Sequence, residues 1–305
     1  MFRLQPAYSS IQVIGKTSIK PTENLSANVH WNEIACLTRL VLVIGNSAKN
    51  TVQSQLFVPE IMHLVTLIAA TGQLYVRRTV YAIVTHMLHA LYSLRLTDAT
   101  ASPEIQIMLD ECCQPEGLRL FGLSKPTPTS DYVTYDPPNG KALIDDLEAL
   151  TRLLLRMMET ISATKGMSLE DLNSPTSTYQ LIGLLNVWRA RWMSLITSSA
   201  FQLSPAVQSR AFVALGVLAT SDVDDDLLYQ MLVAFKTALS QASETDTTSV
   251  VSMLRCITNV VPATNGNSRY LAALIPMSAR LGSFTRFLFT LADANDHQSL
   301  SLEKG

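Results

Sequence analysis

The residues of this chain that could do chemistry are histidines, cysteines and carboxylates that lie close together in the sequence. His86 and His89 are three residues apart, a spacing that can place two metal ligands on one face of a helix. No carboxylate or thiol pair nearby completes a ligand set, so we expect these histidines at an interface between helices. Cys112 and Cys113 are adjacent and point in different directions on a helix, which favours packing as small apolar residues.

Two groups of carboxylates could act as general acids and bases in a dry pocket. One group is Asp145 and Asp146, and the other is Asp224 to Asp226. Each comes at the predicted start of a helix, where the helix dipole favours acidic side chains, so we expect capping rather than catalysis. The sequence contains neither the GxxxxGK[ST] phosphate loop nor the GxSxG nucleophile turn. We therefore assign no catalytic, cofactor-binding or metal-binding residue.

Arginines and tryptophans are the remaining candidates, either in a protein-binding groove or as braces between helices. Helical repeat arrays often bind partners on a concave face, which such side chains could line. For Arg77 and Arg210 we favour bracing, through buried hydrogen bonds to carboxylates or helix ends. Trp188 and Trp192 are four residues apart and are expected to pack between helices. The full set is Arg77, Arg78, Trp188, Arg189, Arg191, Trp192 and Arg210.

The composition argues against several classes of protein. Only 16% of the 305 residues are charged, against about 25% in an average globular domain, so many helix faces are expected either to bury in a large core or to belong to a larger assembly. The net charge is -2 and the basic residues are scattered, which disfavours nucleic-acid binding. The four cysteines form neither a CxxC pair nor a disulfide framework, so we expect a reduced, cytoplasmic setting. Two stretches that could suggest a membrane helix, 61–76 and 79–94, contain no Asp, Glu, Lys or Arg but are too short for a membrane span.

The elements that must position these residues are helices, because apolar residues recur at helical spacing and no long alternating run predicts a strand. Gly45 with Asn46, and Gly72, are the expected ends of the first two helices, and Ser221 is the expected N-cap of a later one. A proline-rich segment at 124–141 is expected to form a loop insertion. The helices are expected at about 31–44, 59–71, 74–96, 103–112, 115–123, 142–161, 176–202, 206–220, 222–239 and 248–261.

Two of these helices begin alike, which suggests an internal repeat. Both starts have the same order: a helix break, then a valine, an arginine, and small or branched apolar residues. The two sequences are GQLYVRRTVYAIV around Arg77 and SPAVQSRAFVALG around Arg210. Arg210 comes 133 residues after Arg77, about three periods of the roughly 40 to 47 residues typical of HEAT-like repeats. We therefore predict an all-α, HEAT/armadillo-like solenoid over residues 29–274. A poorly structured lead-in is expected at 1–28 and a divergent tail at 275–305.

Several segments carry a family resemblance. They read WNEIACLTRLVLVIG, FVPEIMHLVTLIAATGQLYVRRTVYAIVTHMLHAL, LRLFGLSK and RWMSLITSSAFQLSPAVQSRAFVALGVLA. In this order they resemble the helical-repeat region of neurofibromin-type Ras GTPase-activating proteins and point to a fungal member, over residues of about 29–274. The resemblance implies a HEAT-like array that follows a catalytic domain and a Sec14-PH module.

The resemblance also implies what this region does. Family members accelerate GTP hydrolysis by Ras with an arginine finger, which belongs to the catalytic domain and has no counterpart here. The expected role is therefore a scaffold with protein partners, among them Ras-pathway proteins, and self-association through the helical arrays. Two alternatives stay open: a general HEAT-type adaptor or transport protein, and an enzyme with an unrecognised pocket.

The sequence departs from the family pattern near its C-terminus. The segment LAALIPMSARLGSFTRFLFTL contains Pro276 and Gly282 where the family pattern continues as a long helix. This departure suggests a truncated or altered terminus. Because each repeat depends on its neighbour for burial, a shortened array should expose an apolar face and self-associate.

Overall fold

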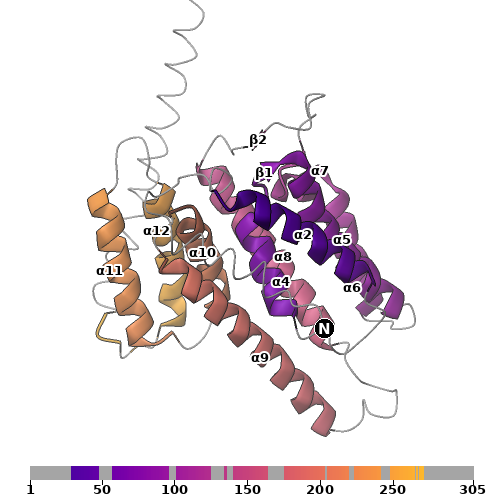
Figure 1. Ribbon diagram of the computed structural model, residues 1–305. Coiled ribbons are helices and arrows are strands. Elements are labelled where there is room, and N and C mark those ends of the chain that lie inside the picture. Colours follow the sequence, from indigo (N-terminus) through magenta and orange to yellow (C-terminus); the bar gives the residue numbers. More distant parts are fainter. Residues whose placement is uncertain are drawn as a thin grey trace, which may run out of the picture. The chain divides into compact units, whose positions relative to one another are not determined.

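The computed structural model is predominantly helical, which confirms the all-α class predicted from periodicity (Figure 1). It describes residues 29–47, 57–95, 101–124, 134–135, 140–163, 175–202, 205–219, 223–241, 248–264, 266 and 268–270. The expected lead-in at 1–28, the expected tail at 275–305, most of the expected loop insertion and Ser221 lie outside these residues. The chain forms two compact units that divide between Ala214 and Leu215.

The first unit contains most of the helices. Its elements are α2 (Trp31–Ser47), α4 (Val58–Ile68), β1 (Gly72–Gln73), α5 (Leu74–Arg95), α6 (Ala101–Cys113), α7 (Pro115–Leu120), β2 (Thr134–Tyr135), α8 (Gly140–Ala163), α9 (Pro175–Ala200) and the start of α10 (Pro205–Leu218). In Figure 1, α5 lies between α2 and α6 and packs against both. Helices α6 and α7 pack on α8, which also contacts α9. Apolar stripes predicted from the sequence form this core, with Ile34, Val80, Leu88, Leu150 and Trp192 fully buried.

The α4 helix is the most deeply buried element of the first unit. Nine of its eleven residues are buried, as expected for a helix that is apolar on all sides. It packs against α8 and α9, which come much later in the sequence. Pro59 lies in its first turn, where the missing N–H costs no helical hydrogen bond. Among the described residues, no helix has both the length and the apolar character needed to cross a membrane.

The connection from α4 to α5 differs from the prediction. The helix ends at Ile68 rather than at Gly72, because Ala70 takes a left-handed conformation with φ 55°. Gly72, with φ 75°, belongs to β1 and pairs antiparallel with β2, opposite Tyr135. A Cβ atom at Gly72 would lie 2.3 Å from Cζ2 of Trp31, so the indole ring requires a glycine there. Strands of two residues are too short to show alternation, which is why the sequence did not predict them.

The second unit contains the end of α10, then α11 (Asp225–Gln241), α12 (Thr248–Val260) and the 3-10 helix η3 (Val261–Ala263). Helices α11 and α12 pack together through buried side chains that include Leu228, Met231 and Leu254. The N-cap of α11 is Asp224, whose Oδ1 accepts a hydrogen bond of 2.7 Å from the backbone N–H of Leu227. The cap predicted at Ser221 was therefore placed too early in the sequence. Similarly, α2 continues to Ser47, past Gly45 and Asn46.

Candidate functional site

Arg77 lies buried in the first turn of α5 and binds the end of another helix. Its Nη1 atom donates a hydrogen bond to the carbonyl oxygen of Gly122. Gly122 follows α7 and has φ 68°, and the Gly122 N–H donates to the Arg119 carbonyl. The Leu123 N–H donates to the Leu118 carbonyl, which completes a Schellman motif. The guanidinium group thus binds the carboxyl end of α7, where the helix dipole favours a cation.

Arg210 makes a similar contact with the end of α4. Its side chain is buried, and Nη1 donates a hydrogen bond of 2.8 Å to the carbonyl oxygen of Ala69, the C-cap of that helix. Burial lowers the pKa of this guanidinium to about 10, so Arg210 stays positively charged at neutral pH. Ala70, which follows the accepting residue, is the left-handed residue that ends α4. The guanidinium therefore satisfies a carbonyl that the helix itself leaves unpaired.

Burial of these two arginines decides which surface they can reach. The sequence analysis favoured bracing, through carboxylates or helix ends, over a partner groove for Arg77 and Arg210. Both side chains are at least nine-tenths buried, and both guanidinium groups contact backbone carbonyls. In this arrangement neither arginine can present its charge on an exposed surface of its unit.

The other candidates divide between the surface and the core. Arg78 is exposed, and Arg189 is half-buried. Arg191 is exposed and forms a salt bridge of 3.0 Å with Glu60 of α4. The two tryptophans of α9, Trp188 and Trp192, are both buried. Of the charged candidates, only Arg78 and Arg191 are therefore exposed.

A buried histidine and serine form a polar contact that the sequence analysis missed. His63 of α4 and Ser199 of α9 are both buried, and Nε2 lies 3.2 Å from Oγ. Burial lowers the pKa of His63 to about 3, so the imidazole is neutral at physiological pH. A serine and a neutral histidine at this distance could form a nucleophile and its base, but a substrate cannot reach fully buried atoms. The signal in the sequence was the position of His63 within the apolar run EIMHLVTLIAA.

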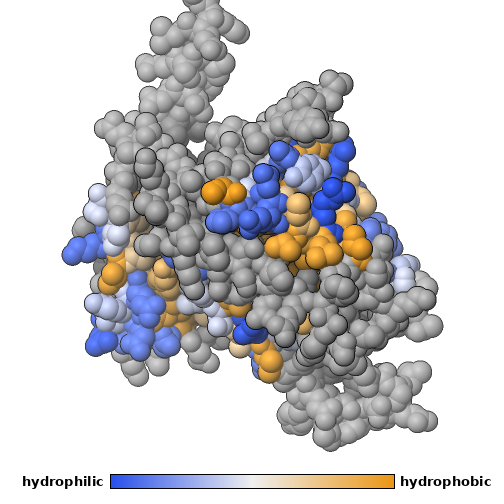
Figure 2. Space-filling view, viewed as in Figure 1, coloured by the Kyte–Doolittle hydropathy of each residue, from blue (hydrophilic) through white to orange (hydrophobic). Residues whose placement is uncertain are grey.

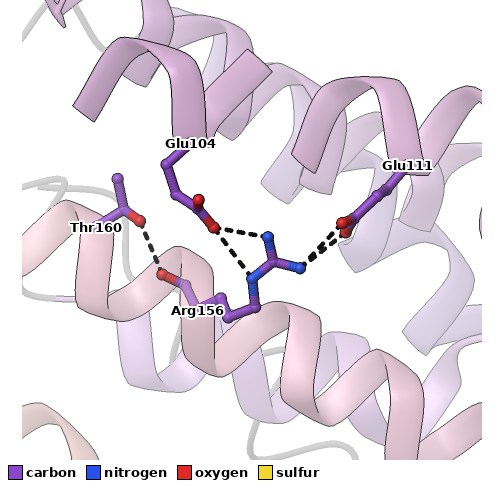
Figure 3. Close-up of polar contacts among 4 residues, drawn as sticks. All are labelled: Glu104, Glu111, Arg156 and Thr160. Carbon is purple, nitrogen blue, oxygen red and sulfur yellow. Dashed lines mark hydrogen bonds and ion pairs between the residues drawn. The ribbon is translucent and has the colours of Figure 1, made fainter. Parts of the chain in front are cut away.

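Arg156 of α8 lies between two carboxylates of α6 (Figure 3). Its Nη2 and Nε atoms donate to one oxygen of Glu104, at 2.6 and 3.2 Å. Its Nη1 atom donates to both oxygens of Glu111, at 2.8 and 3.2 Å. The hydrogen bonds to Glu104 are the main cause that raises the pKa of Arg156. Glu104 and Glu111 are seven residues apart, two helical turns, so one guanidinium can bridge them.

The carboxylates predicted to cap α8 have another position. Because this helix begins at Gly140, Asp145 and Asp146 lie in its second turn rather than at its start. Asp145 is exposed, and Asp146 accepts a hydrogen bond of 3.0 Å from Nε of Arg119 in α7. Burial raises the pKa of Asp146, and the nearby guanidinium partly opposes this rise. The capping prediction was wrong for this pair and right for Asp224.

The histidines and cysteines do not form a joint site among the described residues. His86 and His89 are exposed on α5, so neither lies buried between helices as expected. Cys112 is buried, as predicted for a packing thiol, and burial raises its pKa to about 12. Cys113 is exposed instead, with Sγ 4.0 Å from the hydroxyl of Tyr81. No group of three metal-ligating side chains occurs within the described ranges.

No known protein-family model matches this sequence. The family resemblance therefore depends on the four ordered segments alone. The buried contacts of Arg77 and Arg210 join helices to one another. Their geometry therefore supports a structural role for these two arginines.

Proposed function

We propose that this chain is a non-catalytic helical-repeat scaffold, of the HEAT or armadillo type, in a neurofibromin-like negative regulator of Ras signalling. The order of four resembling segments supports this proposal, as does the helical fold of the described residues. The proposed partners are proteins, including those of the Ras pathway, and the proposed location is the cytoplasm.

The observation that carries the scaffold proposal is the repeated use of a buried arginine. Arg77 and Arg210 each lie near the start of a helix and donate to a carbonyl just past the end of another helix. They are separated by about three periods of a HEAT-like repeat. Contacts of this kind support a scaffold, because each unit of a repeat array is stabilised mainly by its neighbours.

The same contact argues against an arginine finger in these two positions. A finger must reach the transferring phosphoryl group of the nucleotide bound to a partner. The guanidinium groups of Arg77 and Arg210 are buried and already bind carbonyl oxygens. To act on a nucleotide, either arginine would have to leave its helix end, which would break its buried hydrogen bond to that carbonyl.

Single-turnover hydrolysis of Ras-bound GTP tests the non-catalytic role. With this chain in excess, we expect a rate within about twofold of intrinsic hydrolysis, whereas an arginine finger accelerates it by about 10⁵-fold. A large acceleration would refute the proposal and favour the enzyme alternative. A catalytically active Ras GTPase-activating domain serves as the positive control.

Affinity capture with the intact chain tests the choice of partner. We expect enrichment of Ras-pathway proteins, measured by quantitative mass spectrometry. The Arg78→Glu variant reverses the charge of an exposed candidate and leaves the buried helix-end contacts in place. Loss of the same proteins with this variant would assign Arg78 to the binding surface. A reproducible set of partners without Ras-pathway proteins would favour the general adaptor instead.

A further inference from the structure

The outer side of α11 exposes large apolar side chains. Tyr229, Val233 and Leu239 are 55%, 48% and 47% exposed, and Lys236 is exposed beside them. The space-filling view shows hydrophobic and hydrophilic residues together over α11 (Figure 2). The side of this helix that carries Leu228, Met231 and Phe235 is buried, and Leu239, in the last turn, lies at the edge of that side. An outer helix side normally carries charged and polar residues, so this side has the composition of a contact surface.

The last described residues of the chain lie at the start of this apolar side. The hydroxyl of Ser268 donates a hydrogen bond to Oδ1 of Asp225, in the first turn of α11. Arg269 lies 3.5 Å from the other oxygen of the same carboxylate. The ring of Tyr270 lies against the ring of Tyr229, with the centroids 6.2 Å apart. The chain therefore continues from a point directly beside the first exposed apolar residue of α11.

The segment that follows, residues 271–292, has the composition that this side of α11 would bind. It reads LAALIPMSARLGSFTRFLFTLA and contains two basic residues and no acidic one. Leu281, Phe284, Leu288 and Leu291 follow one another at intervals of three and four, so a helix would carry them on one side. The basic residues complement Asp224 to Asp226 at the start of α11.

The length of the segment also fits. The 17 residues of α11 extend over about 25 Å at 1.5 Å per residue. The segment has 22 residues, enough to cover that length even as a helix. Because its first residue is tethered beside Tyr229, its effective concentration at α11 is of millimolar order, well above that of a second copy in dilute solution.

We propose that residues 271–292 of this chain dock on the exposed side of α11 formed by Tyr229, Val233 and Lys236. This intramolecular contact covers the apolar residues of the second unit. It does not depend on the proposed role in Ras regulation, and it holds for any function of the chain. It also replaces self-association as the means by which this apolar side is buried.

Thiol reactivity in the full chain tests the docking. Val233 and Ile107 of α6 are both 48% exposed, so cysteines at these two positions form a matched pair. The exposed Cys36 and Cys113 are first replaced by serine, and the buried Cys112 and Cys256 are kept. Each of the variants V233C and I107C is then labelled with iodoacetamide, and each rate is divided by the rate in denaturant. We expect the thiol at position 233 to react at least tenfold more slowly than the thiol at position 107.

A second variant identifies the segment that protects the thiol. Phe284→Asp and Leu288→Asp are introduced together into the full-length V233C chain. We expect its labelling rate to rise to within about twofold of the rate of I107C. Its urea unfolding midpoint, measured by circular dichroism at 222 nm, should stay at the value of V233C, which shows that the helices remain folded. Persistent protection in this variant would overturn the proposal, as would equal rates in the original pair.

Dilution distinguishes the chain's own segment from a second copy. Protection within one chain stays constant over a hundredfold range of protein concentration, whereas protection by another copy is lost on dilution. Sedimentation velocity on the same samples measures the oligomeric state. Protection that disappears as a dimer dissociates would overturn the intramolecular docking and assign the apolar side of α11 to self-association.

Discussion

Arg210 keeps its positive charge inside the protein, although burial lowers its pKa to about 10. Desolvation of a cation is costly, and a neutral carbonyl offsets less of that cost than a carboxylate would. What the side chain provides is a donor for the Ala69 carbonyl, next to the left-handed Ala70. Arg77 provides the same donor for Gly122 at the end of α7. At the residue scale, both arginines therefore bind a backbone carbonyl beside the end of a helix.

Replacement of Arg210 by alanine should destabilise the first unit. The change leaves a cavity and removes the shorter of the two hydrogen bonds to the Ala69 carbonyl, which together cost about 3 kcal/mol of unfolding free energy; the 3.2 Å bond from Oγ1 of Thr71 remains. Urea unfolding followed by tryptophan fluorescence measures this loss. The matched control is Arg78→Ala, an exposed arginine one position after Arg77, with an expected change within about 0.5 kcal/mol. Equal stability of the two variants would contradict a bracing role for Arg210.

His63 should make the stability of the first unit depend on pH below neutrality. Its pKa falls from 6.5 in the unfolded chain to about 3 in the folded protein, because the imidazole is buried. Between these values the unfolded chain binds a proton that the folded protein does not. The free energy of unfolding contributed by His63 is therefore complete above pH 6.5 and decreases as the pH falls toward 3. At about 1.4 kcal/mol per pH unit, the loss at pH 5 is about 2 kcal/mol.

Two glutamine variants isolate this effect. His63→Gln keeps a polar side chain beside Ser199 but cannot titrate, so it should lose less stability than the wild type between pH 7 and 5. His86→Gln removes an exposed histidine and should keep the full dependence of the wild type. The measurement is urea unfolding at both pH values. The same pH dependence in all three proteins would show that His63 is not the titrating group.

Some of these residue roles could be predicted from the sequence, and others could not. For Arg77 and Arg210 the sequence offered two alternatives, bracing between helices and a partner-binding groove. An arginine among small apolar residues is either buried with a hydrogen-bond partner or extends to the surface. The contact between His63 and Ser199 could not be predicted, because the residues are 136 positions apart and each looks like an ordinary core residue. The position of Asp146 depended on where α8 begins, and a helix boundary is the least certain feature of a periodic pattern.

At the scale of elements, α6 and α8 are joined by the Arg156 cluster. Arg156 is 38% exposed, so water and salt weaken its attraction to Glu104 and Glu111. A double-mutant cycle with Arg156→Leu and Glu104→Gln should give a coupling energy of about 1 kcal/mol, because two N–H groups bind one carboxylate oxygen. Urea unfolding supplies the four stabilities.

Salt supplies the control for this cycle. The screening length falls to about 3 Å at 1 M ionic strength, so the coupling energy should be clearly smaller there. The pair Arg119 and Asp146, which joins α7 to α8 through one hydrogen bond, should show a smaller coupling in a parallel cycle. A coupling near zero in low salt would mean that apolar packing alone holds α6 on α8.

The helices themselves were predictable, but their neighbours were not. Periodicity identifies which side of a helix is buried, and it located the interior of each described helix to within a few residues. It does not identify what covers that side. Helix α4 packs against α8 and α9, whereas a simple stack would place it only beside its neighbours in sequence. A helix that is apolar on all sides does not show which side faces which neighbour, so the packing of α4 could not be predicted from its residues.

At the scale of the whole molecule, the division into two units falls within α10. Almost every described residue of this helix is buried, from Val207 to Leu218. The structure therefore changes from one unit to the other within the apolar sequence AFVALGVL, residues 211–218. Boundaries are usually sought at polar or glycine-rich linkers, and here the divide lies inside a buried helix.

The two units can be monitored separately, because the three tryptophans, at positions 31, 188 and 192, all lie in the first unit. Asp224→Ala removes the N-cap of α11 and should destabilise the second unit by about 1 kcal/mol. We expect this variant to lower the urea midpoint measured by circular dichroism at 222 nm and to leave the tryptophan fluorescence midpoint unchanged. Asp226→Ala, which removes an exposed charge from the first turn but keeps the cap, should have less effect. Equal shifts of both signals in Asp224→Ala would instead show that α10 makes the two units unfold as one, because loss of a cap in one unit would then be felt throughout the chain.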